Sequence, residues 1–257
     1  MSGTLNARTI VVAGSTSAAG VAVVNLLAHA GARVAAVDIL EDRVNELAAG
    51  HESITGYTCN LADLHAVTGL AATIREHLGP VDGLIHLVGG WRGGDGIQGQ
   101  SDADWDFLHT GILTTLRNTS RAFFDDLVAS PAGRLAIVSA ESVASPSADG
   151  AAYTAVKAAA EAWALAVADG FQKAQTSDAD KELTSASLIF VVKALLDERM
   201  RAAQPERKFP GFTHVDALAE AVECIFDADA ARLNGKRIRL GSAAESGATS
   251  VLTEALR

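Results

Sequence analysis

The sequence predicts an α/β fold: one doubly wound parallel sheet with helices on both faces. Short apolar, β-branched segments alternate with segments of helical periodicity from residue 9 to residue 240 of the 257, and this alternation is typical of a parallel sheet covered on both sides. A glycine-rich turn joins the first such strand to the first helix, as in nucleotide-binding units. No linker, repeat or low-complexity tract interrupts the pattern, so we expect residues 1–257 to form a single domain.

The composition limits the classes of function. With 49% hydrophobic and 20% charged residues, the chain is typical of an ordered globular protein with a sizeable core. A formal charge of -10 argues against the clustered positive charge that nucleic acids and anionic membranes require, so we expect neither partner. The cysteines, Cys59 and Cys224, have no metal-ligand spacing and form no disulfide framework. Residues 1–8 lack the apolar core of a signal peptide. We therefore expect an untargeted cytoplasmic protein without a metal.

The first strand, residues 9–13, leads into the glycine-rich turn and then a helix over residues 21–30. Backbone N–H groups of such a turn, together with the positive end of the helix dipole, suit the pyrophosphate of a dinucleotide. We predict cofactor contacts from Gly14, Ser15, Thr16, Ser17, Ala18, Ala19 and Gly20.

A second buried strand, residues 33–38, ends in a carboxylate, Asp38. An acid in this place can hydrogen-bond both ribose hydroxyls of an adenosine and would repel a 2′-phosphate, so Asp38 favours NAD(H) over NADP(H). The alternative is that Asp38 only caps the helix predicted over residues 41–49. Arg33 and Arg43 are the nearest positive charges that could weaken the preference.

The third strand, residues 53–58, is followed by a polar turn, residues 59–63, and a helix that ends near Gly79. Ligands of parallel sheets bind at the carboxyl ends of the strands. We therefore expect Asn60 and Leu61, which follow this strand directly, to line the cofactor site.

The fourth strand, residues 83–87, opens into a loop too rich in glycine for a packed element. We predict that Val88, Gly89 and Gly90 contact the cofactor, and that Trp91 and Arg92 face the substrate from a lid. Simple flexibility is the alternative explanation for the glycines.

Ser101 and Asp104 form a predicted capping box for a long helix that ends before Pro131. A fifth strand, residues 134–138, a small polar loop and a helix from about residue 151 to Gly170 follow. The helix from about residue 151 to Gly170 is apolar on nearly every side, which predicts burial on two faces. We expect a homodimer or homotetramer through the helices containing residues 101–130 and 151–170.

Tyr153 and Lys157 stand four residues apart on this helix, about 40° apart around its axis, and so share one face. Alone, such a pair also fits an ordinary surface aromatic beside a solvated lysine. Beyond it we predict a surface connection over residues 172–182, a strand over residues 185–192 and a charged helix over residues 193–203.

The remainder of the chain is predicted to hold a helix opened by Thr213 with Asp216 and a last strand over residues 236–240. The tail from Gly241 shows no clear pattern.

Taken together, these motifs resemble the short-chain dehydrogenase/reductase family over almost the whole chain. The turn 14–20, the acid after the second strand, the glycine loop after the fourth and the Tyr-x-x-x-Lys pair occur in the family's order. The resemblance implies a Rossmann-type fold that binds a nicotinamide cofactor and a small molecule. It also implies that Tyr153 handles the proton on the substrate oxygen, while Lys157 lowers the phenol pKa and holds the nicotinamide ribose.

The chain departs from the family's pattern at several places. Ala140 stands where most members carry a serine that hydrogen-bonds the substrate carbonyl, and Ile112 stands at the usual asparagine. The turn has Ala18 as its middle residue, and the usual Pro-Gly after the sixth strand is absent. Adjacent side chains on a strand point to opposite faces, so we expect Ser139 to point away from the site. Ser142, in the loop, is then the candidate replacement donor.

The segment from Val88 to Gly94, with its glycine-tryptophan sequence, is similar to the loop of the dihydropteridine-reductase-like branch, which works with Tyr and Lys and without the serine. A quinonoid pterin is therefore a candidate substrate beside small ketones and alcohols, and Trp91 could stack on its ring. A different class of function is a catalytically silent NAD-binding or regulatory protein that keeps the pocket after losing serine and asparagine. Unchanged cofactor binding without NADH oxidation would favour that class.

Overall fold

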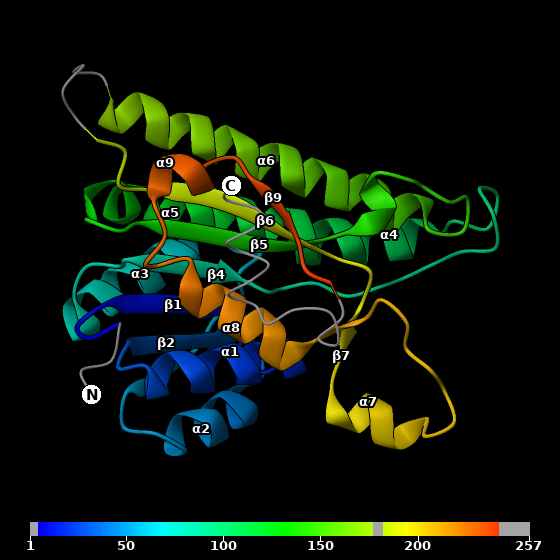
Figure 1. The fold of residues 1–257 in the computed structure, drawn as a ribbon, viewed down its shortest axis with the longest axis horizontal. Coiled ribbons are helices and arrows are strands. Elements are labelled where there is room, and N and C mark those ends of the chain that lie inside the picture. Colours follow the sequence, from blue (N-terminus) through cyan, green and yellow to red (C-terminus); the bar gives the residue numbers. More distant parts are fainter. Residues whose placement is uncertain (1–4, 177–181, 242–257) are drawn as a thin grey trace.

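The computed structural model describes residues 5–176 and 182–241. Within them, a central sheet of seven strands runs in the order β3-β2-β1-β4-β5-β6-β9, and every neighbouring pair is parallel (Figure 1). The strands are β1 (Thr9–Ala13), β2 (Arg33–Asp38), β3 (Ile54–Thr58), β4 (Gly83–His86), β5 (Arg134–Ala140), β6 (Ala186–Val192) and β9 (Arg237–Arg239). The predicted α/β fold with one doubly wound parallel sheet is confirmed.

Helices cover both faces of this sheet. Alternate β1 residues point to opposite sides, so Ile10 packs in one core and Val11 in the other, as the period of a strand requires. The first core faces α1 (Ala18–His29), α2 (Glu41–Ala49), α8 (Val215–Cys224) and α9 (Ala230–Leu233). The second core faces α3 (Leu64–Leu78), α5 (Thr115–Ala129) and α6 (Ala151–Gln175).

The strand order reverses between β1 and β4. From β1 the chain winds outward through β2 to β3, and it then returns through α3 to place β4 on the other side of β1. The two crossover directions leave a crevice at the carboxyl ends of β1 and β4, which is where open α/β sheets bind ligands. The fold therefore gathers the turn after β1 and the glycine loop after β4 at one place.

The opposite end of the sheet is held by a buried arginine. Arg134 begins β5, is only 3% exposed, and donates hydrogen bonds of 2.7–2.8 Å to four main-chain carbonyls. The acceptors are Ile225 O, Gly133 O, Thr184 O and Ala228 O. Since a buried charge needs partners, this guanidinium fixes β5 to the loops before β6 and after α8.

The long helix opened by Ser101 is interrupted by a wider turn. The N-cap half of the predicted capping box is confirmed, because Ser101 Oγ accepts a 3.1 Å hydrogen bond from the Asp104 N–H. The Asp104 carboxylate accepts from the Ser101 hydroxyl at 2.7 Å. After α4 (Asp102–Leu108), residues His109–Thr114 are π-helical before α5 begins. A one-residue widening of this kind has no sequence periodicity of its own, so the pattern predicts only a continuous helix.

Residues 193–203 form less helix than predicted. Leu195–Leu196 make a short strand, β7, that pairs in parallel with β8 (Thr213–His214). Helix α7 begins only at Glu198, because the Asp197 side chain accepts a 2.6 Å hydrogen bond from the Met200 N–H and caps it. The predicted helix was therefore wrong for residues 193–197.

Two helix ends also differ from expectation. Thr213 does not open α8, because its hydroxyl donates to Leu240 O at 2.8 Å and His214 is the N-cap. Helix α6 does not stop at Gly170 but continues to Gln175. A Cβ on Gly170 would lie 3.1 Å from the Phe124 ring, so this glycine serves close packing of α6 on α5. Residues 177–181 of the predicted connection and the tail after Gly241 lie outside the described residues.

Candidate active site

Two adjoining pockets open at the carboxyl ends of the strands in the described part of the chain. Each has a cavity volume of about 670 Å³, a size that holds a cofactor half or a small substrate. The β2-side pocket reaches Asp38 and Asn60, and the α6-side pocket reaches Tyr153. Four lining residues belong to both pockets: Ser17, Leu87, Val88 and Gly89. The two pockets are therefore parts of one continuous groove.

The turn after β1 requires glycine at both ends. Gly14 has a φ of +82°, and a Cβ there would lie 2.8 Å from the Val88 nitrogen. A Cβ on Gly20 would lie 2.2 Å from the carbonyl oxygen of Gly14. The turn is thus packed against the β4 loop, with no room for side chains at these two positions.

The same turn presents donors to the groove. Ser17 caps α1 by accepting a 3.0 Å hydrogen bond from the Gly20 N–H, and Ala18 and Ala19 line the α6-side pocket in the first turn of the helix. The N-terminus of α1, with its unpaired N–H groups and positive dipole end, therefore borders the groove. Ser15 lines neither pocket, and its Oγ is buried without a hydrogen-bond partner among the described residues.

Asp38 lies at the far end of the β2-side pocket and is held by the turn. Its Oδ2 accepts hydrogen bonds from the Thr16 hydroxyl at 2.8 Å and the Thr16 N–H at 3.1 Å, and its Oδ1 accepts from the Ile39 N–H at 2.7 Å. Helix α2 has Leu40 as its N-cap residue and no side-chain cap, so Asp38 does not cap it. Arg43 lines the same pocket.

The loop after β3 completes the β2-side pocket. Asn60 and Leu61 both line it, and Asn60 Oδ1 accepts a 3.1 Å hydrogen bond from the Ala62 N–H. Asn118, from α5, is 4% exposed and donates to both Leu61 O and Ala62 O at 3.0 Å. Sequence reasoning missed Asn118, because the contact joins residues more than fifty positions apart.

Tyr153 and Lys157 both line the α6-side pocket. The Lys157 Nζ donates a 2.7 Å hydrogen bond to Val138 O on β5 and lies 5.8 Å from the centroid of the Tyr153 ring. Burial lowers the pKa of Lys157 to about 8, while the nearby Glu161 carboxylate acts in the opposite direction. Burial raises the pKa of Tyr153, whereas the family resemblance implies a lowered one. In this protein environment the phenol is therefore neutral near pH 7.

The positions beside this pair differ in their hydrogen bonding. Ala140 and Ser142 line the α6-side pocket, and Ser142 Oγ accepts a 3.2 Å hydrogen bond from the Thr154 hydroxyl. Ser139, which was expected to point away from the site, also lines this pocket. It is 1% exposed, and its Oγ has no hydrogen-bond partner among the described residues. Ile112 is buried, and its Cγ1 would lie 3.5 Å from a Cβ on Gly89. Neither Ala140 nor Ile112 offers a donor to a ligand.

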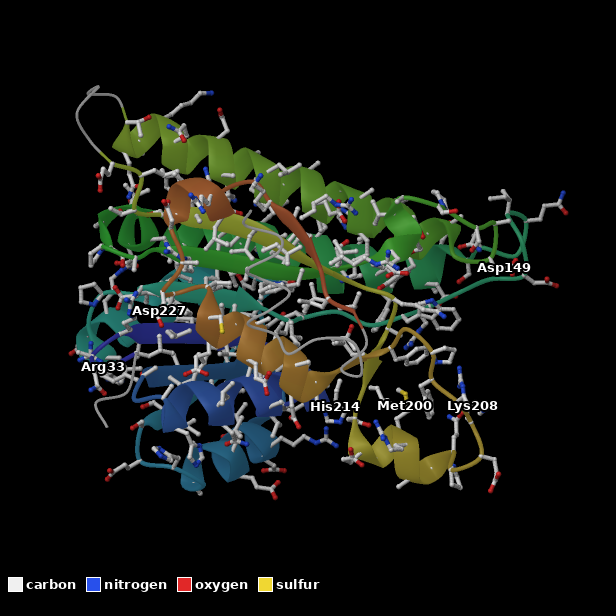
Figure 2. The ribbon with its side chains drawn as sticks, viewed as in Figure 1. Arg33, Asp149, Met200, Lys208, His214 and Asp227 are labelled. Carbon is white, nitrogen blue, oxygen red and sulfur yellow. The ribbon has the colours of Figure 1, made fainter. Side chains whose placement is uncertain are left out.

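The glycine loop after β4 is tied to the loop before α6. Asp149 accepts from the Gly96 N–H at 3.0 Å through its side chain and from the Gly94 N–H at 2.8 Å through its carbonyl, and Figure 2 shows Asp149 at the edge of the molecule. The Gln100 amide bridges both loops, since its Nε2 donates to Gly96 O and its Oε1 accepts from the Ala152 N–H. The loop is thereby ordered despite its glycines.

Val88, Gly89 and Gly90 border the α6-side pocket, as does Trp91. Trp91 is 66% exposed, so its indole face is largely open. Arg92 lines neither pocket. Its guanidinium instead lies 4.2 Å from the centroid of the Phe107 ring, so Trp91 and Arg92 occupy different surroundings.

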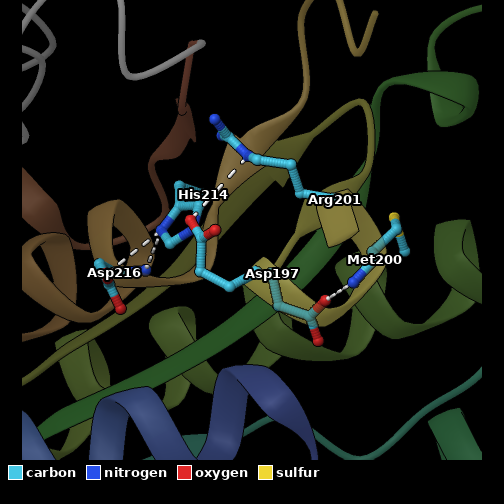
Figure 3. A network of polar contacts seen from close by, with 6 residues as sticks. Asp197, Met200, Arg201, His214 and Asp216 are labelled. Carbon is cyan, nitrogen blue, oxygen red and sulfur yellow. Dashed lines mark hydrogen bonds and ion pairs between the residues drawn. The ribbon is translucent and has the colours of Figure 1, made fainter. Parts of the chain in front are cut away.

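The α7 segment covers the outer side of the α6-side pocket. Asp197, the N-cap residue of α7, and Met200, within the helix, line it. Met200 lies on the part of the ribbon that projects beside the sheet (Figure 2). His214 links this segment to α8, because Nε2 lies 3.2 Å from the Glu198 carboxylate and Nδ1 lies 3.3 Å from that of Asp216 (Figure 3). The sequence predicted a charged helix here but did not place it at the pocket.

His86, at the end of β4, is a second residue that sequence reasoning missed. It is 4% exposed, lines the α6-side pocket, and its Nε2 lies 3.1 Å from Thr115 Oγ1. Burial, together with the positive charge of Lys157, lowers the pKa of His86 to about 3. Its imidazole is therefore neutral throughout the physiological range.

Two other kinds of feature are absent from residues 5–176 and 182–241. No group of three or more His, Cys, Asp or Glu side chains in this part could hold a metal ion. None of its helices is long and apolar enough to cross a membrane.

Residues 8–176 match the profile of the family described as short chain dehydrogenase. Over 153 residues the chain is 30% identical to 2,3-dihydro-2,3-dihydroxybenzoate dehydrogenase from Bacillus subtilis. This match covers 58% of each protein. Over 135 residues it is 30% identical to acetoacetyl-CoA reductase from Synechocystis, covering 52% of this chain and 53% of that protein. The match thus spans little more than half the length of these relatives.

Solved structures share the fold over nearly the whole chain. An NADPH-bound short-chain oxidoreductase from Pseudomonas aeruginosa, described as containing an atypical catalytic center, gives a TM-score of 0.79 at 18% identity, with 94% of this chain and 98% of that one covered. NAD+-bound xylitol dehydrogenase gives 0.77 at 14% identity, with coverage of 93% and 100%. With the profile match, the groove and the Tyr-x-x-x-Lys helix, the chain belongs to the short-chain dehydrogenase/reductase family of nicotinamide-dependent oxidoreductases.

Proposed function

We propose that this protein is an NAD(H)-dependent oxidoreductase that transfers a hydride between nicotinamide and a small carbonyl, alcohol or quinonoid substrate. The observation that carries the proposal is the continuity of the groove. One end holds a carboxylate, Asp38, and the other holds Tyr153 and Lys157, with the N-terminus of α1 between them. A dinucleotide laid along this groove would have its adenosine near Asp38 and its nicotinamide near Tyr153.

The residues present fit such a cofactor. Gly14 and Gly20 leave a side-chain-free cradle, and the α1 N-terminus offers N–H groups to a pyrophosphate. Asn60 and Leu61 border the adenosine end, and Val88, Gly89 and Gly90 border the nicotinamide end. Asp38 keeps a fixed carboxylate in the pocket that can accept from ribose hydroxyls and would repel a 2′-phosphate. Arg43 opposes that preference from the same pocket.

Bound nicotinamide supplies or accepts the hydride. In the direction of reduction, the Tyr153 hydroxyl donates its proton to the substrate oxygen or nitrogen, and its raised pKa keeps this proton in place before the reaction. The Lys157 ammonium stabilises the phenolate that results, and its hydrogen bond to Val138 O fixes its position. Lys157 would also hold the ribose beside the nicotinamide.

The substrate pocket lacks the usual carbonyl-polarising hydroxyl at Ala140. A quinonoid ring such as a pterin accepts hydride and proton without that group, and the open face of Trp91 is available for stacking. Ser142, which also lines this pocket, is the proposed replacement donor. Arg92 would contact substrate only after leaving the Phe107 ring. We therefore rank quinonoid pterins first and small ketones second.

The test combines binding with turnover. NADH and NADPH affinities are measured by fluorescence titration, and NADH oxidation is followed with ketones, quinones and quinonoid dihydropterin. We expect NADH to bind more tightly than NADPH and turnover to be lost in Tyr153→Phe. Tight cofactor binding without turnover on any substrate would favour a catalytically silent NAD-binding protein, and tighter NADPH binding would refute the cofactor assignment.

We also propose that a single domain assembles into a homodimer or homotetramer through the helices containing residues 101–130 and 151–170, and that it works in the cytoplasm. Three large hydrophobic side chains on these helices are more than 40% exposed: Trp105, Phe107 and Leu165. Exposed apolar groups of this size on neighbouring helices are typical of subunit contacts. Sedimentation of the purified protein tests the assembly, and a monomer would refute it.

A further inference from the structure

The π-helical turn between α4 and α5 forms a wall of the cofactor groove. Thr110, Gly111 and Thr115 line the β2-side pocket directly. Ile112, in the same turn, and the Lys157 Nζ both lie close to Gly89. A Cβ placed on Gly89 would lie 3.5 Å from Ile112 and 3.9 Å from Nζ. The shape of this turn therefore affects both ends of the groove.

The turn takes the usual main-chain donor away from one carbonyl. In a regular α-helix the Thr115 N–H would donate to Gly111 O, but here it donates to Thr110 O, one residue earlier. The Thr115 hydroxyl replaces the missing donor and bonds Gly111 O at 2.7 Å. The side chain of Thr115 thus donates to Gly111 O, while the Thr115 N–H donates to Thr110 O.

His86 completes the arrangement from the neighbouring strand. Because the Thr115 hydroxyl gives its one hydrogen to Gly111 O, its oxygen can only accept from the His86 Nε2–H, which lies 3.1 Å away. Both side chains are at least 95% buried. A chain of two hydrogen bonds therefore runs from β4 to the π-turn, and a neutral imidazole with its proton on Nε2 is the form that supplies it.

We infer that His86 and Thr115 are positioning residues, which hold the π-turn in place and so set the wall that the cofactor meets. Neither side chain is assigned a chemical step. The expected effect of these residues on cofactor binding rests on the proposed function. Their expected effect on the π-turn does not depend on that function.

Amide hydrogen exchange tests the turn itself without any cofactor. We expect Thr115→Val and His86→Leu to speed exchange in peptides covering residues 109–116 by about tenfold, the change expected for loss of about 1.4 kcal/mol. Thr115→Ser, which keeps the hydroxyl, and His86→Gln, which keeps an N–H donor, should restore slow exchange. Thr119→Val is the matched control, because Thr119 is an equally buried threonine whose hydroxyl bonds Thr115 O and Leu116 O within the helix. Equal exchange in Thr115→Val and Thr119→Val would overturn the inference.

NADH titration of the same variants separates this inference from the proposed function. We expect Thr115→Val to bind NADH about tenfold more weakly than Thr119→Val, with Thr115→Ser near wild type. If the wild type binds NADH and both valine variants bind it equally, the positioning role is refuted and the proposed function stands. If the wild type binds no nicotinamide nucleotide, the proposed function fails, and the exchange data alone decide whether His86 and Thr115 hold the turn.

Discussion

Replacing Lys157 with methionine is expected to remove turnover and yet stabilise the fold at pH 7. The pKa of Lys157 is lowered from 10.5 to about 8, so at pH 7 the folded state disfavours the ammonium by about 3 kcal/mol. Because the side chain keeps some access to the groove, we reduce this to about 2 kcal/mol. Loss of its hydrogen bond to Val138 O costs about 1 kcal/mol, which leaves a net gain of about 1 kcal/mol.

The pH dependence gives this prediction its sign. Between pH 8 and pH 10.5 the unfolded chain binds a proton that the folded chain does not, so the wild type gains stability as pH rises through this window. Urea unfolding should therefore find Lys157→Met more stable than wild type at pH 7 and no more stable at pH 10. Lys193→Met is the control, because that exposed ammonium also donates to a main-chain carbonyl, Pro210 O at 3.0 Å. A loss of stability at pH 7 equal to that of Lys193→Met would refute the reasoning.

Three further outcomes are expected. Tyr153→Phe should lower turnover at least about 100-fold while the NADH dissociation constant stays unchanged, and turnover at the wild-type rate would remove Tyr153 from the reaction. Asp38→Ala should shift the ratio of NADH to NADPH affinity by about tenfold toward NADPH, as measured by fluorescence titration. His86 has a folded pKa of about 3 against 6.5 unfolded, so the unfolded chain takes up the proton first, and the wild type should lose about 2 kcal/mol between pH 7 and pH 5 from this group. Urea midpoints of His86→Gln should fall less over this interval, and an equal fall would contradict the assignment.

The order of elements was predictable because each has a local signal. Alternating apolar strands, the turn from Gly14 and the Ser101 cap each depend on residues close in sequence, and the structure confirms the sheet and this cap. The errors occur where partners are distant. Strand β7 exists because Leu195 pairs with Thr213, and no short-range pattern in residues 193–197 reveals that partner.

Residues of the candidate site were likewise predictable only where their signal is local in the sequence. Asp38 and Tyr153 could be singled out because each stands at a recognisable place after a strand or on a helix. The supporting residues His86 and Asn118 could not, because their importance comes from hydrogen bonds to Thr115 and to Leu61 O that cross between elements. Periodicity also treats a π-turn as ordinary helix.

The four carbonyl groups that bind Arg134 form a cage at one end of β5, while the groove lies at the other end. These hydrogen bonds secure β5 at its first residue, whereas Ala140, which lines the α6-side pocket, is the last residue of the same strand. Changes at the catalytic end therefore leave the cage untouched. Because the two ends of β5 are held independently, a substitution at Ala140 should alter the groove without loosening the anchor at Arg134.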